Sequence, residues 1–171
     1  MRNDSVRRIN LGEVGCEPRP QLPDGFRRDS TRVGAALGAV RSGLSVYELP
    51  PGQAVSPYHY EEPEEEWLLV VSGKPTLRHP NGEEQLEPWD IVFFPAGPAG
   101  AHLVRNDGDS DARVAMFSSS GATVGTVVYP DSDTVWVWTD DDAVDLIVKR
   151  SSAVDDLTPW TAGANKADGE T

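Results

Sequence analysis

Two of the three histidines in this chain of 171 residues lie near its densest run of glutamates. His59 and Glu61 are two residues apart, Glu66 closes the glutamate-rich run, and His102 follows further along. Imidazole nitrogens and carboxylate oxygens are common ligands of divalent ions in proteins. The residue types therefore indicate a metal site, and they leave open whether a reaction takes place there.

Strands would be needed to bring these four side chains together. In a strand over residues 56–61, His59 and Glu61 would project to the same face, because side chains two apart in a strand point the same way. A second strand would begin near Glu66 and place it at the inward mouth of a barrel, provided that the alternate apolar residues after it face inward. A third strand would open with His102. Ligands from three strands would then meet in a pocket inside the barrel.

Short apolar runs separated by turn residues recur through the middle of the chain, and this pattern is typical of a β-sandwich or barrel. We expect an all-β fold without a convincing amphipathic helix, apart from a possible single turn over 139–145 or after Ser151. The dipeptides Asn81-Gly82 and Asp107-Gly108 are both favoured in tight hairpin turns. The expected strands are 43–49, 67–71, 75–79, 90–94, 102–105, 113–118, 124–129, 135–138 and 146–148.

The same region resembles two motifs of the cupin superfamily, G-x5-H-x-H-x3,4-E-x6-G and G-x5-P-x-G-x2-H-x3-N. The first motif is matched, in order, by Gly52, His59, Glu61, Glu66 and Gly73. The second motif is matched by Pro95, Gly97, His102 and Asn106. The stretches 129–132 and 168–170 further resemble a group of small bacterial single-domain cupins of mostly unassigned function. The resemblance implies a cupin double-stranded β-helix, which is a jelly-roll barrel.

The loops depart from these motifs. Six residues rather than five separate Gly52 from His59, and Trp89 stands where the second motif begins with glycine. Two extra residues lie between Gly97 and His102. Loops accept such changes at little cost, so we expect the barrel to be retained.

In the family, two histidines and a glutamate of the first motif, with the histidine of the second, bind a divalent metal. Carried over to this chain, the resemblance implies the ligands His59, Glu61, Glu66 and His102. Glu61 replaces the family's second histidine, so it is either a ligand, the relic of a site that has lost its metal, or a residue that points away. Two imidazoles and two carboxylates around a divalent ion have a net charge of about zero, which favours Zn, Mn or Fe over copper.

Composition suggests three regions. Residues 1–30 are rich in Arg, Asp, Pro and Gly and are expected to form an N-terminal arm, residues 31–150 the cupin barrel, and residues 151–171 a tail partly docked on the barrel through Trp160. The N-terminal segment is expected to add strands across a homodimer.

Charge and cysteine usage restrict the partners and the compartment. The net charge of -13 repels phosphate backbones, so we expect no nucleic-acid partner. No signal peptide is apparent in the first thirty residues, and no stretch approaches the ~20 apolar residues of a membrane span, so no membrane partner is expected. The single Cys16 fits a reducing compartment, and we expect the protein to be cytoplasmic.

The resemblance implies a metal-binding cupin that holds a small polar molecule in its barrel. Such a protein is either a metal-dependent enzyme of the dioxygenase, isomerase or decarboxylase type, or a non-catalytic binding or sensing module, because the fold does not fix the reaction. No catalytic residue and no organic cofactor are assigned. The remaining glutamates of the run, Glu62, Glu64 and Glu65, are expected to lie in a solvated turn. His79, Arg78 and Arg105 are expected at the surface, although either arginine could bind an anionic ligand at the barrel mouth.

Overall fold

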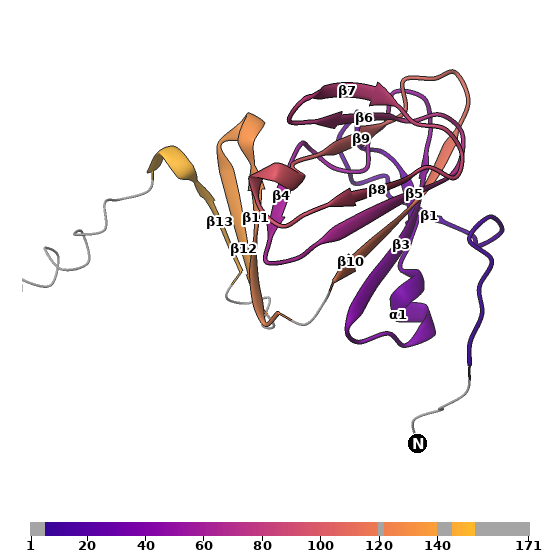
Figure 1. The fold of residues 1–171 in the computed structure, drawn as a ribbon, viewed down its shortest axis with the longest axis horizontal. Coiled ribbons are helices and arrows are strands. Elements are labelled where there is room, and N and C mark those ends of the chain that lie inside the picture. The colour runs from indigo at the N-terminus through magenta and orange to yellow at the C-terminus, as the bar shows by residue number, and fades with distance from the viewer. Residues whose placement is uncertain (1–5, 120–121, 140–144, 153–171) are drawn as a thin grey trace, which may run out of the picture.

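The structure is a computed structural model that describes residues 6–119, 122–139 and 145–152. Strands dominate it and build two facing layers (Figure 1). The expected all-β fold is confirmed, and all nine expected strands are present with ends shifted by one residue at most.

The larger layer is a six-stranded sheet in which every neighbouring pair is antiparallel. In spatial order its strands are β1 (Glu17–Pro18), β2 (Asp29–Thr31), β3 (Ser42–Leu49), β10 (Ala112–Ser119), β5 (Glu66–Ser72) and β8 (Ile91–Phe94).

The facing layer consists of two smaller antiparallel sheets. One contains β13 (Leu146–Lys149), β12 (Thr134–Thr139), β11 (Val124–Tyr129) and β4 (Tyr60–Glu62). The other contains β7 (Gly82–Gln85), β6 (Thr76–His79) and β9 (Leu103–Arg105). Two isolated bridges, Ala54 with Arg105 and His59 with His102, join the sheets along a seam.

The expected strand over 56–61 is only partly correct. Its regular part is β4, which begins at Tyr60, and His59 pairs through the isolated bridge just before it. Pro57 lies in the irregular part, and a proline has no N–H to donate to a ladder.

The main core lies between the layers. Full burial of a large aliphatic side chain contributes roughly 1.5 to 3 kcal/mol, so this cluster supplies most of the driving force for folding. Leu68 and Val70 both belong to it, which confirms that this face of β5 points inward and that Glu66 shares it. The cluster contains Leu49, Val55, Leu68, Val70, Leu77, Leu86, Phe94, Val104, Ala112, Val114 and Met116.

One short helix, α1 (Val33–Leu37), precedes β3, where no helix was expected. It ends at Gly38, whose φ of 79° is left-handed, the conformation in which glycine commonly stops a helix. A Cβ on Gly34 would lie 3.0 Å from the backbone nitrogen of Leu44, so the small residue allows the helix to lie against β3. A five-residue helix is too short to show the apolar periodicity that would reveal it in the sequence.

The N-terminal segment packs on the outer face of its own chain's large sheet. Arg113 holds it in place by donating from Nη1 to the carbonyl of Leu11 and from Nη2 to that of Val14, each at 2.9 Å. The same Nη2 lies 2.7 Å from Glu48 Oε1. A second apolar cluster, centred on Val33, Val46 and Ala115, lies beneath this segment. Whether it also contacts a second copy stays a prediction.

The two expected hairpin turns differ in outcome. Asn81-Gly82 joins β6 to β7, with His79 opposite Gly82, and this prediction is confirmed. Asp107-Gly108 does not form a hairpin, because β9 and β10 belong to different sheets and the turn carries the chain from one layer to the other.

Three 3-10 turns complete the described elements, η1 (Pro98–Gly100), η2 (Pro130–Ser132) and η4 (Arg150–Ser152). Within the described ranges, no helix is long and apolar enough to cross a membrane. The expected docking of Trp160 and the possible turn over 140–144 fall outside the described residues.

Candidate metal centre

His59 and His102 are direct cross-strand partners at the seam. The amide of His59 donates to the carbonyl of His102 at 3.1 Å, and the amide of His102 donates back at 2.8 Å. Residues that exchange both hydrogen bonds in an antiparallel pair project to the same face. The ring centroids accordingly lie 4.6 Å apart, so two residues distant in the sequence share one site.

Backbone carbonyls orient both rings. His59 Nδ1 lies 2.9 Å from the carbonyl of Pro57, and His102 Nδ1 lies 2.9 Å from that of Gly100. A carbonyl can only accept a hydrogen bond, so each Nδ1 carries the proton and each Nε2 presents a lone pair. Histidine ligands in proteins are commonly held this way through the nitrogen that does not bind the metal.

Glu66 completes a triad with these rings. Its Oε2 lies 3.5 Å from His102 Nε2 and 3.9 Å from His59 Nε2. One ligand atom from each of the three residues falls within 4.8 Å of the others. Atoms bound to one ion at about 2.1 Å lie roughly 3 to 4 Å apart, so this donor set fits a divalent ion.

Burial is the largest cause of the pKa shifts of the three triad side chains. It lowers the pKa of His102 to about 3, assisted by the neighbouring charge of His59, and it also lowers the pKa of His59. Both imidazoles are therefore neutral near pH 7, as metal ligation requires. Burial, with the negative charge of Glu61 second, raises the pKa of Glu66 to about 8. A bound cation would favour the ionised carboxylate and offset this effect.

Glu61 lies beside the triad. It projects from β4 opposite Val127, and its Oε1 is 3.9 Å from His59 Nε2. Burial raises the pKa of Glu61 to about 7, and Glu64 adds to the effect through its charge and a side-chain hydrogen bond. Glu64 thus contacts the site, although the sequence places it in a solvated turn. The mutually close group contains His59, Glu66 and His102, and ligation by Glu61 stays a prediction.

Two aromatic rings support the histidines, and neither contact is predicted by the spacing of the motifs. Phe94 stacks on His102 with centroids 3.7 Å apart and an interplanar angle of 10°. Tyr129 stacks against His59 at 5.9 Å. Phe94 is directly opposite Glu66 in the pairing of β5 with β8, a relation that depends on strand register. These stacked rings restrict the orientation of the two imidazoles.

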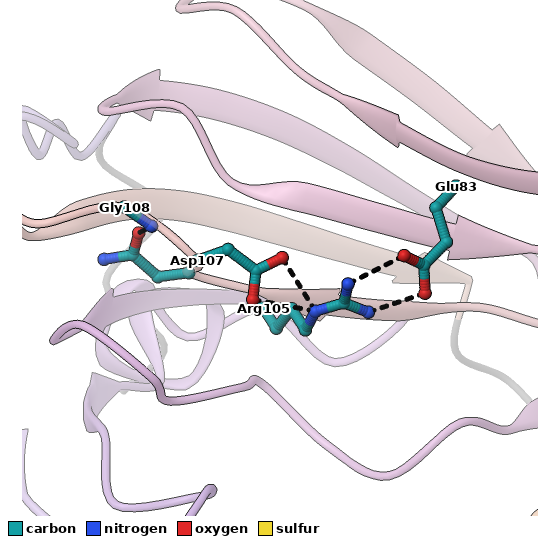
Figure 2. A network of polar contacts seen from close by, with 5 residues as sticks. Glu83, Arg105, Asp107 and Gly108 are labelled. Carbon is teal, nitrogen blue, oxygen red and sulfur yellow. Dashed lines mark hydrogen bonds and ion pairs between the residues drawn. The ribbon is translucent and has the colours of Figure 1, made fainter.

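The surface arginines of this layer are paired with carboxylates. Arg78 contacts both oxygens of Asp131 and lies 3.9 Å above the ring of Tyr58. Arg105 binds both oxygens of Glu83 at 2.7 Å and contacts Asp107 through Nε, as Figure 2 shows. Because both guanidinium groups are occupied, the alternative that they bind an anionic ligand loses its main support. His79 lies 3.6 Å from Glu84 at the surface, as expected.

Comparison with known proteins agrees with this geometry. Residues 45–118 match the family model described as the cupin domain. This chain contains a cupin domain. The matched range includes both motifs and all three residues of the triad. No curated protein compared with the chain matches it.

Several solved structures resemble two thirds or more of the chain. A candidate sugar phosphate isomerase from Acidithiobacillus ferrooxidans is 25% identical with a TM-score of 0.74, covering 85% of this chain and 91% of that one. A sugar phosphate isomerase from Silicibacter pomeroyi is 23% identical with a TM-score of 0.73, covering 86% and 95%. The polyketide cyclase RemF from Streptomyces resistomycificus is 21% identical with a TM-score of 0.55, covering 67% and 80%. The last two likenesses show the fold alone.

Proposed function

We propose that this cupin binds one divalent ion through His59, Glu66 and His102 and isomerises a small sugar-like hydroxy-carbonyl compound. The observation that carries the proposal is the convergence of two Nε2 atoms and one carboxylate oxygen in a buried site. The likeness to a candidate sugar phosphate isomerase, at 25% identity over most of both chains, supports the reaction class. Zn, Mn and Fe suit two imidazoles and a carboxylate.

In this proposal the chain's own groups have separate tasks. A bound divalent ion would polarise a substrate oxygen. Phe94 and Tyr129 restrict the orientation of the imidazoles. Isomerisation moves a proton between neighbouring carbon atoms, which requires a positioned acid or base. Glu61 is beside the triad but outside its mutually close group, so we assign the proton transfer to Glu61.

Metal content tests the first part of the proposal. Protein purified without a histidine tag should contain about one equivalent of a divalent metal by elemental analysis. His59→Ala and His102→Ala should each lose most of it, whereas His79→Ala, the same change at the surface histidine, should keep it. Less than roughly a tenth of an equivalent in the unmodified protein, or equal loss in all three variants, would contradict the assignment.

Turnover tests the second part. The metal-loaded protein should convert a member of a panel of aldoses, ketoses and their phosphates, with solvent deuterium incorporated at carbon as seen by proton NMR. Glu61→Gln should keep the metal and lose turnover by at least about a hundredfold, the lower range for general acid or base catalysis. Loss of metal in this variant would instead make Glu61 a ligand. Ligand-induced thermal stabilisation without conversion would favour a binding module over an enzyme.

A further inference from the structure

A second polar cavity lies at the flank of the six-stranded sheet, away from the metal triad. Its volume is about 500 Å³, and it is formed by β2, β3 and the loop that follows β1. None of its lining residues belongs to the triad or to the acidic run. Its polar lining includes Arg19, Arg28, Arg32, Ser30, Ser45 and Tyr47.

Three arginines line this cavity, and no carboxylate is among its lining residues. Among the residues that the structure describes, no ion pair involves Arg19, Arg28 or Arg32. The chain has 28 acidic residues against 15 basic ones, so carboxylates are plentiful elsewhere. Burial lowers the pKa of the Arg28 guanidinium, Tyr47 partly offsets this through its charge and a side-chain hydrogen bond, and the positive charge of Arg19 adds a smaller lowering. An anion in the cavity would relieve this repulsion.

Arg28 is held in position while one of its donors lacks a partner. Its guanidinium lies 5.1 Å from the ring centroid of Tyr47, and Nη1 donates to the carbonyl of Phe26 at 3.4 Å. Its Nε is the one buried side-chain nitrogen or oxygen in the described ranges without a hydrogen-bond partner. A buried donor without a partner is destabilising, so the protein's own groups do not fully satisfy the Arg28 guanidinium.

Hydroxyl groups supply further donors. Ser30 Oγ accepts a hydrogen bond from Arg19 Nε at 3.2 Å, which leaves its own hydrogen available for a ligand. Ser45 and Tyr47 project from the neighbouring strand β3 into the same cavity.

We propose that this cavity binds the phosphoryl group of a small molecule. Guanidinium groups match phosphate oxygens with paired N–H donors, and donors that approach from several strands suit a tetrahedral group better than a planar carboxylate. The site is independent of the metal centre, because its lining residues all lie outside the triad.

Inorganic phosphate is the probe for this site. Thermal unfolding of the full chain would be followed against potassium phosphate, with potassium chloride at equal ionic strength and potassium acetate as comparisons. Phosphate should raise the midpoint in a saturable way, and Arg28→Met and Arg32→Gln should each weaken phosphate binding about tenfold, as expected for a lost charge-assisted hydrogen bond. Arg41→Gln removes the same charge from an exposed residue outside the cavity and should leave binding unchanged.

Several results would overturn the proposal. One is equal stabilisation by chloride or acetate, and another is unchanged phosphate binding in both cavity variants. If Arg28→Met fails to fold, the exposed Arg32 still provides the test. Phosphate binding should also persist in EDTA and in His102→Ala, because loss in either case would place the anion at the metal and not in this cavity.

Discussion

At the scale of single residues, the side-chain amide of Asn106 forms hydrogen bonds with the backbone of three other residues. It is 1% exposed, and its Nδ2 donates to the carbonyls of Leu49 at 2.7 Å and Ser110 at 2.8 Å. Its Oδ1 accepts from the amide of Gly108 at 3.0 Å. The asparagine that ends the second motif therefore holds the crossover between the two layers.

Asn106→Ala should destabilise the protein by about 3 kcal/mol, because two buried carbonyls lose their donor and one amide loses its acceptor. Urea unfolding measures the change, and Asn81→Ala in the exposed turn before β7 is the matched control. A loss equal to that of the control would show that water replaces the amide without cost.

Some residues of the site could be predicted from a sequence motif, and others could not because their contacts depend on the three-dimensional fold. His59, Glu66 and His102 could be predicted because a motif fixes their spacing. The contacts of Glu64 with Glu61 and of Phe94 with His102 could not be predicted, since they depend on turn conformation and strand register. A one-residue change of register would send each side chain to the opposite face, and the sequence does not specify that register directly.

At the scale of elements, Arg105 connects β9 to β7 across β6 (Figure 2). Its hydrogen bonds lower the pKa of Glu83 from 4.5 and that of Asp107 from 3.8. Carboxylates with a lower pKa in the folded state bind fewer protons there than in the unfolded state. Their contribution to stability is therefore present above about pH 4.5 and is lost as the pH falls below it.

Arg105→Gln should be less stable than the unmodified protein at pH 7, and this difference should shrink by more than half at pH 3. Urea unfolding midpoints at the two pH values check the prediction. Because the pairs are partly exposed, the difference at pH 7 should also decrease in 1 M salt. A difference that grows on acidification would contradict this role.

The loop before β9 positions His102, one of the proposed metal-binding residues. A Cβ on Gly100 would lie in steric overlap with the carbonyl oxygen of Pro95, and the carbonyl of Gly100 accepts the hydrogen bond from His102 Nδ1. Gly100→Ala should therefore displace the ring and weaken metal binding by about 10-fold to 100-fold, the usual effect of disturbing a group that orients a ligand.

Metal titration monitored by competition with a chelator would measure this effect. Gly15→Ala, where a Cβ has no neighbour within 4 Å, is the matched control. Metal affinity unchanged in Gly100→Ala would show that the loop adjusts without moving His102.

Elements with a clear apolar pattern could be predicted, and others could not. The four longer strands of the large sheet, β3, β5, β8 and β10, contain apolar runs or apolar residues in alternation, whereas β7 reads Gly-Glu-Glu-Gln and is exposed throughout. It is a strand because β6 pairs with it, a cause that lies outside its own sequence. The same holds for the short strands β1 and β2, of which β1 is the edge strand of the large sheet and β2 pairs between β1 and β3.

At the scale of the whole molecule, the sequence predicted the barrel from its motifs but not how the chain divides into layers. The turn at Asp107-Gly108 has hairpin residues yet changes layer, because β10 finds both of its partners, β3 and β5, in the large sheet. The N-terminal segment has no periodicity, and its place on the sheet depends on Arg113, about a hundred residues away. Such contacts become visible only in three dimensions.

His59 and His102 adjoin strands of two different sheets, so an ion bound to both residues would also hold these sheets together. The amide hydrogens of these ligands bond only to each other's carbonyls, so opening the seam and releasing the metal are expected to be one event. Hydrogen exchange at these two amides should slow by about tenfold or more with saturating metal, while amides between β11 and β12 should change little. The exchange rate at the seam would then report occupancy of the site without any knowledge of the substrate.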